Sequence, residues 1–252
     1  MQRRPSPRFR ALAPVAGVLF LLASTSFGCS STDPTGSGGN GGGGSGGNAM
    51  PDAGSQPVTV TLHPNAPPVA GESECTVVKV TGIAIPDSQH VAVCSSVDYA
   101  TNPPSGGPHW PVWAARGKYT SPIPRQLAVH NLEHGWIVLS YRCKDACPDV
   151  VAALEKAFDE TDDTYCVANG DGMSRVILAP DPELATPIAL SAWGATYTAT
   201  CIDPTSIAEF IAARIGRGTE KVCGGGQLPT LVTAGCSGSS DGGLDGGAGD
   251  GG

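Results

Sequence analysis

Short runs in which apolar and polar residues alternate, or in which β-branched residues accumulate, predict the strands of this chain. Valine-rich segments at 76–80 and 91–94 are bounded by turn residues, and residues 136–141 alternate with a period of two. Residues 175–179 and 188–200 have the same strand-like character. We therefore expect several short strands.

Helical spacing of apolar residues predicts about three helices. Pro124 can open a short helix that runs to His134 and stops at Gly135, Pro148 opens a second, and Asp203 caps a third. The two longer helices carry apolar stripes, formed by Val150, Val151, Leu154 and Phe158 in one and by Ile207, Phe210, Ile211 and Ile215 in the other. Strands and helices together predict a single compact α+β domain.

Residues 99–110 contain too many prolines and glycines for regular structure. Such a segment forms a shaped loop, and this one carries His109 close to its end. We expect the loop to hold that histidine in a fixed position.

The N-terminal segment has the pattern of an export signal. Four arginines precede an apolar stretch at 11–22, which is too short for a comfortable transmembrane helix. Gly28 then stands directly before Cys29, as in a bacterial lipoprotein cleavage site. We expect a signal peptide at 1–28 and a lipid on Cys29, with ordinary secretory cleavage near the same point as the alternative.

Composition divides the remaining chain into three parts. Residues 29–57 are mostly Gly, Ser, Asn and Thr, which predicts a flexible tether that lipid on Cys29 would hold at the membrane. Residues 58–223 have the composition of a globular α+β domain, and residues 224–252 form a Gly/Asp-rich tail that we expect to be disordered. This organisation predicts a secreted, membrane-anchored protein of the cell envelope, in the periplasm or at the outer cell surface.

Cysteine usage supports export. The chain has nine cysteines, and assigning Cys29 to lipid leaves an even number for disulfides. The remaining eight, all expected to form disulfides, are Cys75, Cys94, Cys143, Cys147, Cys166, Cys201, Cys223 and Cys236. Thiolate metal binding by Cys143 and Cys147 is the rival interpretation, but an oxidising compartment disfavours free thiolates and no second close pair completes a four-sulfur site.

The mature chain is acidic. Removing the four arginines of the signal from 15 basic residues leaves 11 against 23 acidic ones, a formal net charge of −12. No basic patch is present, which argues against nucleic acid as a partner and against attraction to anionic lipid. The lipid on Cys29 is then the expected route to the membrane, and a protein or glycan partner is open.

Two of the five histidines lie four residues apart in the sequence His130-Asn131-Leu132-Glu133-His134. On a helix these histidines share one face, with the carboxylate beside them. A pair of imidazoles at that spacing is half of a zinc or copper site. We expect metal ligands at His109, His130 and His134, with His90 and Glu133 as further candidates. The alternative is structural, with the histidines hydrogen-bonded to backbone carbonyls and Glu133.

The same letters match the H-x-x-E-H pattern of inverse zinc peptidases. In that interpretation Glu133 is the catalytic base and Glu155, Glu209 or Glu220 completes the zinc site. Such peptidases need a much larger chain than this one, so hydrolysis is the weaker hypothesis and enzymatic turnover stays open.

A non-enzymatic surface module is the alternative of a different class. The expected lipid, tether and disulfides, together with the acidic composition, are typical of a domain that is held away from a membrane and binds a partner there. The sequence does not distinguish a protein partner from a glycan.

Several motifs between about residues 85 and 222 form a recognisable set: Asn102-Pro103-Pro104-Ser105-Gly106-Gly107-Pro108-His109, Trp113, Gly117-Lys118-Tyr119, Val129 to Gly135, Tyr141-Arg142, Ala192-Trp193-Gly194, Phe210 and Gly218-Thr219-Glu220. Together these motifs resemble those of the bacterial domain of unknown function 3105. The resemblance implies a secreted or membrane-anchored globular domain and brings no established catalytic residues. The chain departs from the family at Ser105-Gly106-Gly107, where Thr-Ser-Gly is usual, and in its extra cysteines.

Overall fold

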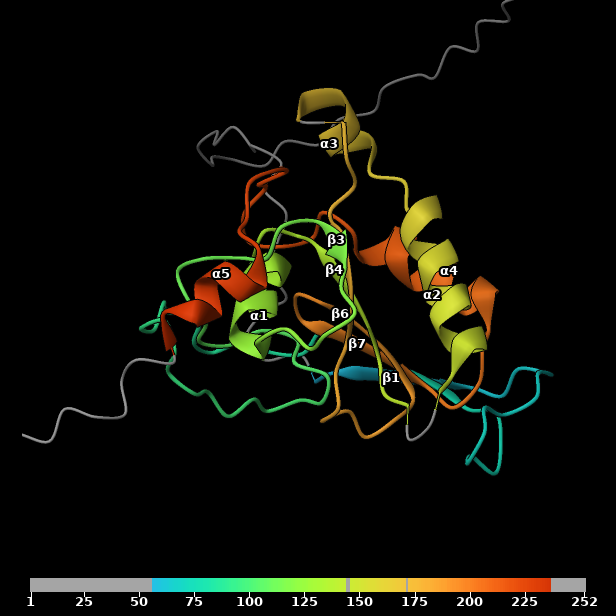
Figure 1. Cartoon of the computed structure of the whole chain (residues 1–252). Coiled ribbons are helices and arrows are strands. Elements are labelled where there is room, and N and C mark those ends of the chain that lie inside the picture. The colour runs from blue at the N-terminus through green and yellow to red at the C-terminus, as the bar shows by residue number, and fades with distance from the viewer. Residues whose placement is uncertain (1–55, 144–145, 171, 237–252) are drawn as a thin grey trace, which may run out of the picture. The chain divides into compact units, whose positions relative to one another are not determined.

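A seven-stranded mixed sheet forms the centre of the domain (Figure 1). The computed structural model describes residues 56–143, 146–170 and 172–236. Along the chain the elements are β1 (Val58–Leu62), β2 (Val77–Thr81), β3 (Gly117–Lys118), α1 (Arg125–Glu133), β4 (Ile137–Tyr141), α2 (Pro148–Glu160), α3 (Thr164–Asn169), β5 (Val176–Pro180), β6 (Ile188–Ala192), β7 (Ala195–Ala199), α4 (Pro204–Arg214) and α5 (Pro229–Ala234).

The sheet has the strand order β1-β2-β7-β6-β4-β5-β3. Pairing is antiparallel from β1 to β4, and the last two pairs, β4 with β5 and β5 with β3, are parallel. Parallel neighbours need a crossover, and α2 and α3 supply the one between β4 and β5. The mixed sheet therefore has helices packed on it from both sides.

Alternation along the central strands divides the core into two layers. In β4, Ile137 and Leu139 face one apolar cluster, together with residues of α2 and α4, while Val138 faces the other, with α1. In β5, Ile177 likewise joins the α1 side. Successive side chains of a strand point to opposite faces, so one short strand serves both layers. Figure 1 shows α1 and α5 on one side of the sheet and α2 and α4 on the other.

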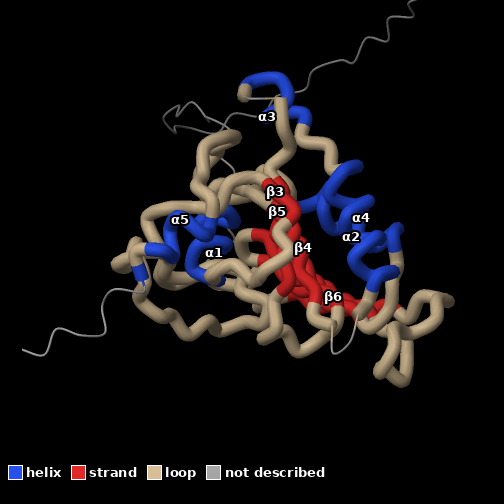
Figure 2. Tube along the Cα trace, in the orientation of Figure 1, coloured by secondary structure: helices blue, strands red, loops and turns tan. Residues whose placement is uncertain are grey.

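Loops dominate the α1 side of the sheet (Figure 2). There Trp110, Trp136 and Trp193 bury their rings around α1. Because these aromatic residues come from loops and strand ends, α1 is enclosed by irregular chain, and its residues from Leu127 to Glu133 are all buried. Polar side chains on this helix are therefore held in a largely dry environment.

The α+β prediction is confirmed, and so are the three predicted helices, as α1, α2 and α4. Residues 91–94, expected to be a strand, are irregular: only Val91 donates a backbone hydrogen bond, to His109, and Cys94 adopts φ +73°. A residue with positive φ ends an extended strand.

The C-terminal boundary also needs correction. The disordered tail was expected to begin at residue 224, but residues up to Cys236 are described, and they include α5. Val232 is buried against the α1 layer, and Cys236 is joined to Cys94. This packing and cross-link hold a segment whose glycine-rich start suggested a tail.

The eight predicted disulfide cysteines form four pairs, Cys75–Cys201, Cys94–Cys236, Cys143–Cys147 and Cys166–Cys223. Four disulfides in so small a domain indicate an extracytoplasmic protein. Among the described residues, no helix has the length and apolar character needed to cross a membrane. The signal peptide, the lipid on Cys29 and the tether to residue 55 lie outside the described residues and stay predictions, which intact-mass analysis of the exported protein can test.

Candidate metal centre

Four side chains from three segments converge beside α1. His90 and His109 come from loops, and His130 and Glu133 from the helix. Each offers one ligand atom, and these four atoms all lie within 4.8 Å of one another. His109 and His130 are 0% and 4% exposed, whereas His90 is open to solvent. The group therefore has a buried base and one solvent-facing side.

A backbone carbonyl fixes the orientation of His130. Its Nδ1 lies 2.6 Å from the carbonyl oxygen of Trp110. A carbonyl only accepts hydrogen bonds, so Nδ1 carries the proton and donates it. In the neutral ring this leaves a lone pair on Nε2, the atom that lies 3.1 Å from Nε2 of His134.

His109 is oriented in the same way. Its Nδ1 donates to the carbonyl oxygen of Gly107 at 2.8 Å, and its Nε2 lies 3.0 Å from Oε2 of Glu133. Backbone hydrogen bonds hold the two loops together, from Val91 to the His109 carbonyl and from His109 to the Gln89 carbonyl. This short parallel bridge brings His90 beside His109, with ring centroids 5.0 Å apart.

His109 and Glu133 form a buried ion pair. Burial opposes a charge on His109, but the hydrogen bonds to Glu133 and to the Gly107 carbonyl outweigh it and raise the pKa of His109 above its usual value. Burial also disfavours the charged form of Glu133 and by itself would raise its pKa. The hydrogen bond and charge of His109 outweigh burial, so the pKa of Glu133 is lowered. Both ring nitrogens of His109 face oxygen atoms, an arrangement that favours the protonated ring.

The pKa values of His130 and His134, the two histidines of the helix motif, are shifted downward, opposite to that of His109. Desolvation is the main cause that lowers the pKa of His130 and of His134 to about 4. Both rings are therefore neutral near pH 7. A neutral imidazole is the form that binds transition metals.

His134 lies beside the four-residue group. Its Nε2 is 3.1 Å from Nε2 of His130 and 3.1 Å from Oε2 of Glu220. Its other nitrogen, Nδ1, is buried and has no hydrogen-bond partner among the described residues. His134 thus touches the group through His130 and extends it towards Glu220.

Close backbone packing places Glu220 against the helix end. The Glu220 N–H donates to the Glu133 carbonyl at 3.0 Å, and the Gly216 N–H donates to the Gly135 carbonyl at 2.8 Å. A Cβ atom on Gly218 would collide with the Glu133 carbonyl, so glycine is needed there. The side chain of Glu220 remains about half exposed, at 56%.

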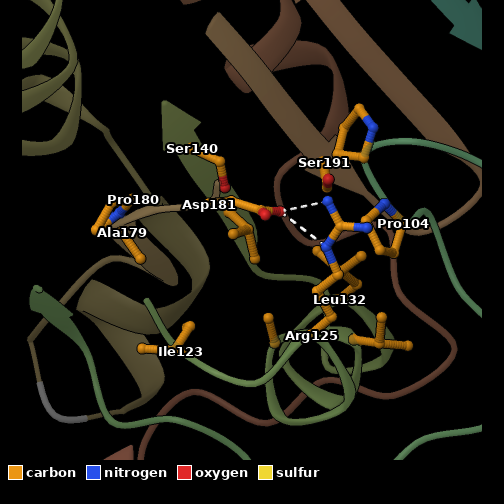
Figure 3. Close-up of a pocket in the computed structure, with 13 residues that line it drawn as sticks. Pro104, Ile123, Arg125, Leu132, Ser140, Ala179, Pro180, Asp181 and Ser191 are labelled. Atoms are coloured by element: carbon orange, nitrogen blue, oxygen red, sulfur yellow. Dashed lines mark hydrogen bonds and ion pairs between the residues drawn. The ribbon is translucent and has the colours of Figure 1, made fainter. Parts of the chain in front are cut away.

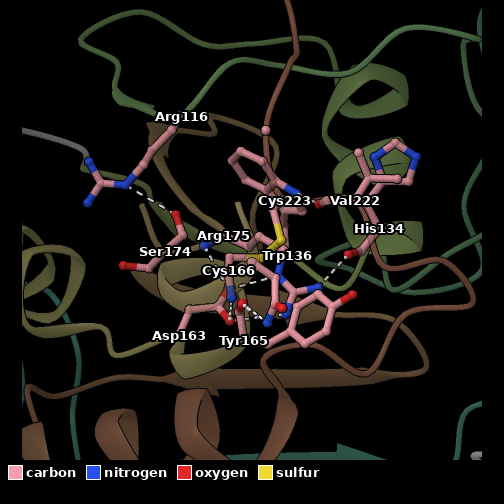
Figure 4. Close-up of a disulfide and its surroundings, with 12 residues drawn as sticks. Arg116, His134, Trp136, Asp163, Tyr165, Cys166, Ser174, Arg175, Val222 and Cys223 are labelled. Atoms are coloured by element: carbon pink, nitrogen blue, oxygen red, sulfur yellow. Dashed lines mark hydrogen bonds and ion pairs between the residues drawn. A yellow bond between two sulfur atoms is a disulfide. The ribbon is translucent and has the colours of Figure 1, made fainter. Parts of the chain in front are cut away.

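A buried ion pair supports His134 from behind (Figure 4). Arg175 donates to the His134 carbonyl at 3.2 Å and to both carboxylate oxygens of Asp163, at 2.7 and 3.1 Å. The Cys166–Cys223 disulfide lies beside this pair. Bidentate contact to Asp163 fixes the guanidinium, which in turn fixes the backbone at the end of α1.

The structure distinguishes among the glutamates that the peptidase hypothesis offered as a third ligand. Glu220 contacts His134. Glu209, on α4, forms an ion pair with Lys79 at 3.3 Å, and Glu155 lies on α2. Helices α2 and α4 cover the sheet face opposite α1, which separates both from the histidines.

Sequence reasoning missed the groups that orient the rings. The carbonyls of Gly107 and Trp110 are backbone atoms, which no residue type identifies in advance. Trp113 was also missed as a neighbour, although its ring centroid lies 4.5 Å from that of His134 and 5.1 Å from that of His130. The only signal for it was its place among four tryptophans in so small a domain.

A small pocket lies on another face of α1 (Figure 3). Its volume is about 30 Å³, and its lining includes Arg125, Leu132 and Ser140. Arg125 and Asp181 point towards each other there and form an ion pair at 2.8 Å. A space of this size holds about two water molecules. None of the histidines lines it, so the metal candidates belong to a separate side of the helix.

Residues 90–224 match the family described as "Protein of unknown function (DUF3105)". This range begins at His90 and includes all the histidines and glutamates of the candidate centre: His90, His109, His130, Glu133, His134 and Glu220. No curated protein and no solved structure matches the chain.

Proposed function

Because this chain belongs to the DUF3105 family, whose description assigns no activity, we propose from the site itself that the domain binds a transition-metal ion, zinc or copper(II). The ligands are His90, His109, His130 and Glu133. The disulfides indicate that it does so outside the cytoplasm, and we propose that lipid on Cys29 holds it at the cell envelope.

One observation carries the proposal. His109 and His130 are both buried, and each donates Nδ1–H to a backbone carbonyl, while Nε2 of His109 lies 3.0 Å from Glu133 and Nε2 of His130 lies 3.1 Å from Nε2 of His134. Metal-binding histidines in proteins almost always have their second nitrogen engaged in this way, because the contact fixes both tautomer and ring orientation. Two independent rings oriented alike favour a ligand role over incidental packing.

Distances between the donors agree with a metal site. Two ligands bound about 2.0–2.1 Å from zinc in a tetrahedron lie about 3.3 Å apart. Nε2 of His109 and Oε2 of Glu133 are 3.0 Å apart, and all four ligand atoms lie within 4.8 Å of one another. Small side-chain movements are enough to place these donors around one ion.

The donor types narrow the metal. Imidazole nitrogen with one carboxylate suits zinc and copper(II), whereas calcium and magnesium prefer oxygen ligands alone. All eight cysteines in the described part of the chain are paired, so thiolate does not contribute. Binding at His109 displaces the proton that it shares with Glu133, so metal uptake releases protons.

Zinc-dependent hydrolysis is the second candidate. It is favoured by Glu220, which lies 3.1 Å from His134 and could complete a site with His130. Glu133 would be the base, but its contact with His109 lowers its pKa and makes it a weaker base. Metal binding without hydrolysis therefore ranks first.

Metal affinity of histidine variants tests the proposal. The mature protein is produced under oxidising conditions, and zinc and copper(II) affinities are measured by competition with a chelator. His130→Ala should weaken binding at least ~100-fold because it removes a buried ligand, while His63→Ala, which removes an exposed histidine, should leave it unchanged.

The proposal fails if His109→Ala and His130→Ala both keep wild-type affinity. It also fails if the wild-type protein binds neither metal. The structural role of the histidines, and a protein or glycan partner, would then be the better account.

A further inference from the structure

The donors beside α1 outnumber the positions of one tetrahedral ion. Besides His90, His109, His130 and Glu133, the side chains of His134 and Glu220 reach the same region. We propose a second metal position next to the first, held by His134 and Glu220 with Glu133 between the two ions. This inference rests on the proposed function and extends it to a two-metal centre.

Coordination number supplies the first argument. A protein zinc ion has about four ligands, and three histidines with one carboxylate already satisfy one ion. His134 and Glu220 are therefore left without a role in the first position. Their types, one imidazole and one carboxylate, repeat the donors of that position.

Contact distances supply the second argument. Nε2 of His134 lies 3.1 Å from Nε2 of His130, and 3.1 Å from Oε2 of Glu220. Ions in two-metal sites are about 3.5–4 Å apart, so ligands of adjacent ions lie side by side as these do. Glu133 precedes His134 on the same helix end, and only its Oε2 contacts His109, which leaves its second oxygen for a bridge.

The surroundings of His134 supply the third argument. This residue is 2% exposed, and its Nδ1, unlike that of His109 and His130, has no hydrogen-bond partner in the described part of the chain. Its polar contacts there are both made by Nε2, to His130 and to Glu220. This buried ring therefore has no polar partner besides residues of the centre.

Glu220 gives the second position its solvent side. Its backbone is fixed on the Glu133 carbonyl, so the side chain is delivered to His134 without being buried itself. With His134, Glu220 and the shared Glu133 as its protein ligands, the second ion retains a coordination position for water. Water bound to such an ion is available for exchange with an external ligand.

Zinc stoichiometry of the full mature chain tests the second position. The wild-type protein, titrated calorimetrically with Zn²⁺ alone and then analysed for metal content, should bind about two equivalents. Glu220→Gln should bind about one, because only the second ion loses its carboxylate. Glu209→Gln is the control, since Glu209 is similarly exposed but pairs with Lys79, and it should keep two.

Each outcome is informative. One equivalent in the wild type overturns the second position and leaves the proposed function intact, whereas none overturns both. Two equivalents in Glu220→Gln also overturn the assignment.

Copper(II) gives an independent readout by electron paramagnetic resonance. The first equivalent should produce a mononuclear signal, and the second should weaken it through coupling between neighbouring ions. Glu220→Gln should keep the mononuclear signal throughout. A wild-type signal that doubles with the second equivalent would place the ions too far apart for this centre.

Discussion

At the scale of single residues, similar burial leads to opposite pKa shifts at neighbouring histidines. Hydrogen bonds to Glu133 and to the Gly107 carbonyl raise the pKa of His109 despite desolvation, whereas desolvation lowers the pKa of His130 and of His134 to about 4. The carbonyls behind His109 and His130 decide which nitrogen is exposed to the centre. Residue identity alone therefore does not determine the chemistry of these rings.

The neutral rings predict how the metal-free protein responds to acid. The pKa of His134 is about 4 in the folded state and 6.5 in the unfolded chain, so below pH 6.5 the unfolded chain takes up the proton and stability falls until about pH 4. Between pH 7 and pH 5 this ring alone should reduce the free energy of unfolding by about 2 kcal/mol.

Urea unfolding in the presence of a chelator measures this effect. His134→Gln should show a smaller loss between pH 7 and pH 5 than the wild type, by about 2 kcal/mol. Carboxylates, His109 and His130, whose pKa is also lowered to about 4, are present in both proteins, so the difference between the two losses reports mainly on His134. Equal losses in the two proteins would mean that His134 is not a buried neutral ring.

At the scale of elements, disulfides hold the irregular segments that bring the ligands together. His90 lies on a loop that is joined to the rest of the domain at two points. His90 itself forms a backbone bridge with His109, and Cys94, four residues later, is disulfide-bonded to Cys236 just after α5. Helix α1 supplies a row of buried polar residues, whereas the exposed candidate ligand His90 lies four residues before this cross-link.

We expect loss of that disulfide to weaken metal binding. Cys94→Ala/Cys236→Ala should reduce zinc affinity on the order of tenfold, because the His90 loop is no longer held against α5. Cys75→Ala/Cys201→Ala is the matched control, since it opens a loop of similar length, 126 residues against 142, on the opposite side of the sheet.

Circular dichroism first establishes that both variants fold, and affinity is then compared. If the Cys94/Cys236 variant binds zinc as the control does, the cross-link stabilises the domain without positioning His90.

Elements with a strong pattern could be predicted from the sequence, and weakly patterned ones could not. Helix α2 has an apolar stripe and was found, whereas α3 buries only Cys166 and offers no periodicity. Residues 91–94 contain valines at alternate positions, yet Val93 is 36% exposed and the segment has no strand partner. Local composition cannot report whether a partner strand is present.

The candidate site was predicted in its residue types but not in its arrangement. The sequence indicated His109, His130 and His134 as ligands, with His90 and Glu133 as further candidates. The structure groups His90, His109, His130 and Glu133, and it places His134 beside that group. Glu220 was one of three glutamates that sequence could not rank, because its position depends on a backbone hydrogen bond to the Glu133 carbonyl. Contacts between segments far apart in the chain are decided by the fold.

At the scale of the whole molecule, the sheet separates two layers of different composition. The face with α2 and α4 carries a large apolar core, while the face with α1 combines tryptophans, loops and buried polar groups. The candidate metal ligands His90, His109, His130 and Glu133 converge beside α1 on this second face.

X-ray absorption at the zinc edge of the zinc-loaded mature protein tests the central claim most directly. We predict a first shell of nitrogen and oxygen only, at about 2.0–2.1 Å, with the scattering pattern of several imidazoles. A sulfur shell near 2.3 Å, or zinc that shows no imidazole contribution, would contradict a centre built from His90, His109, His130 and Glu133.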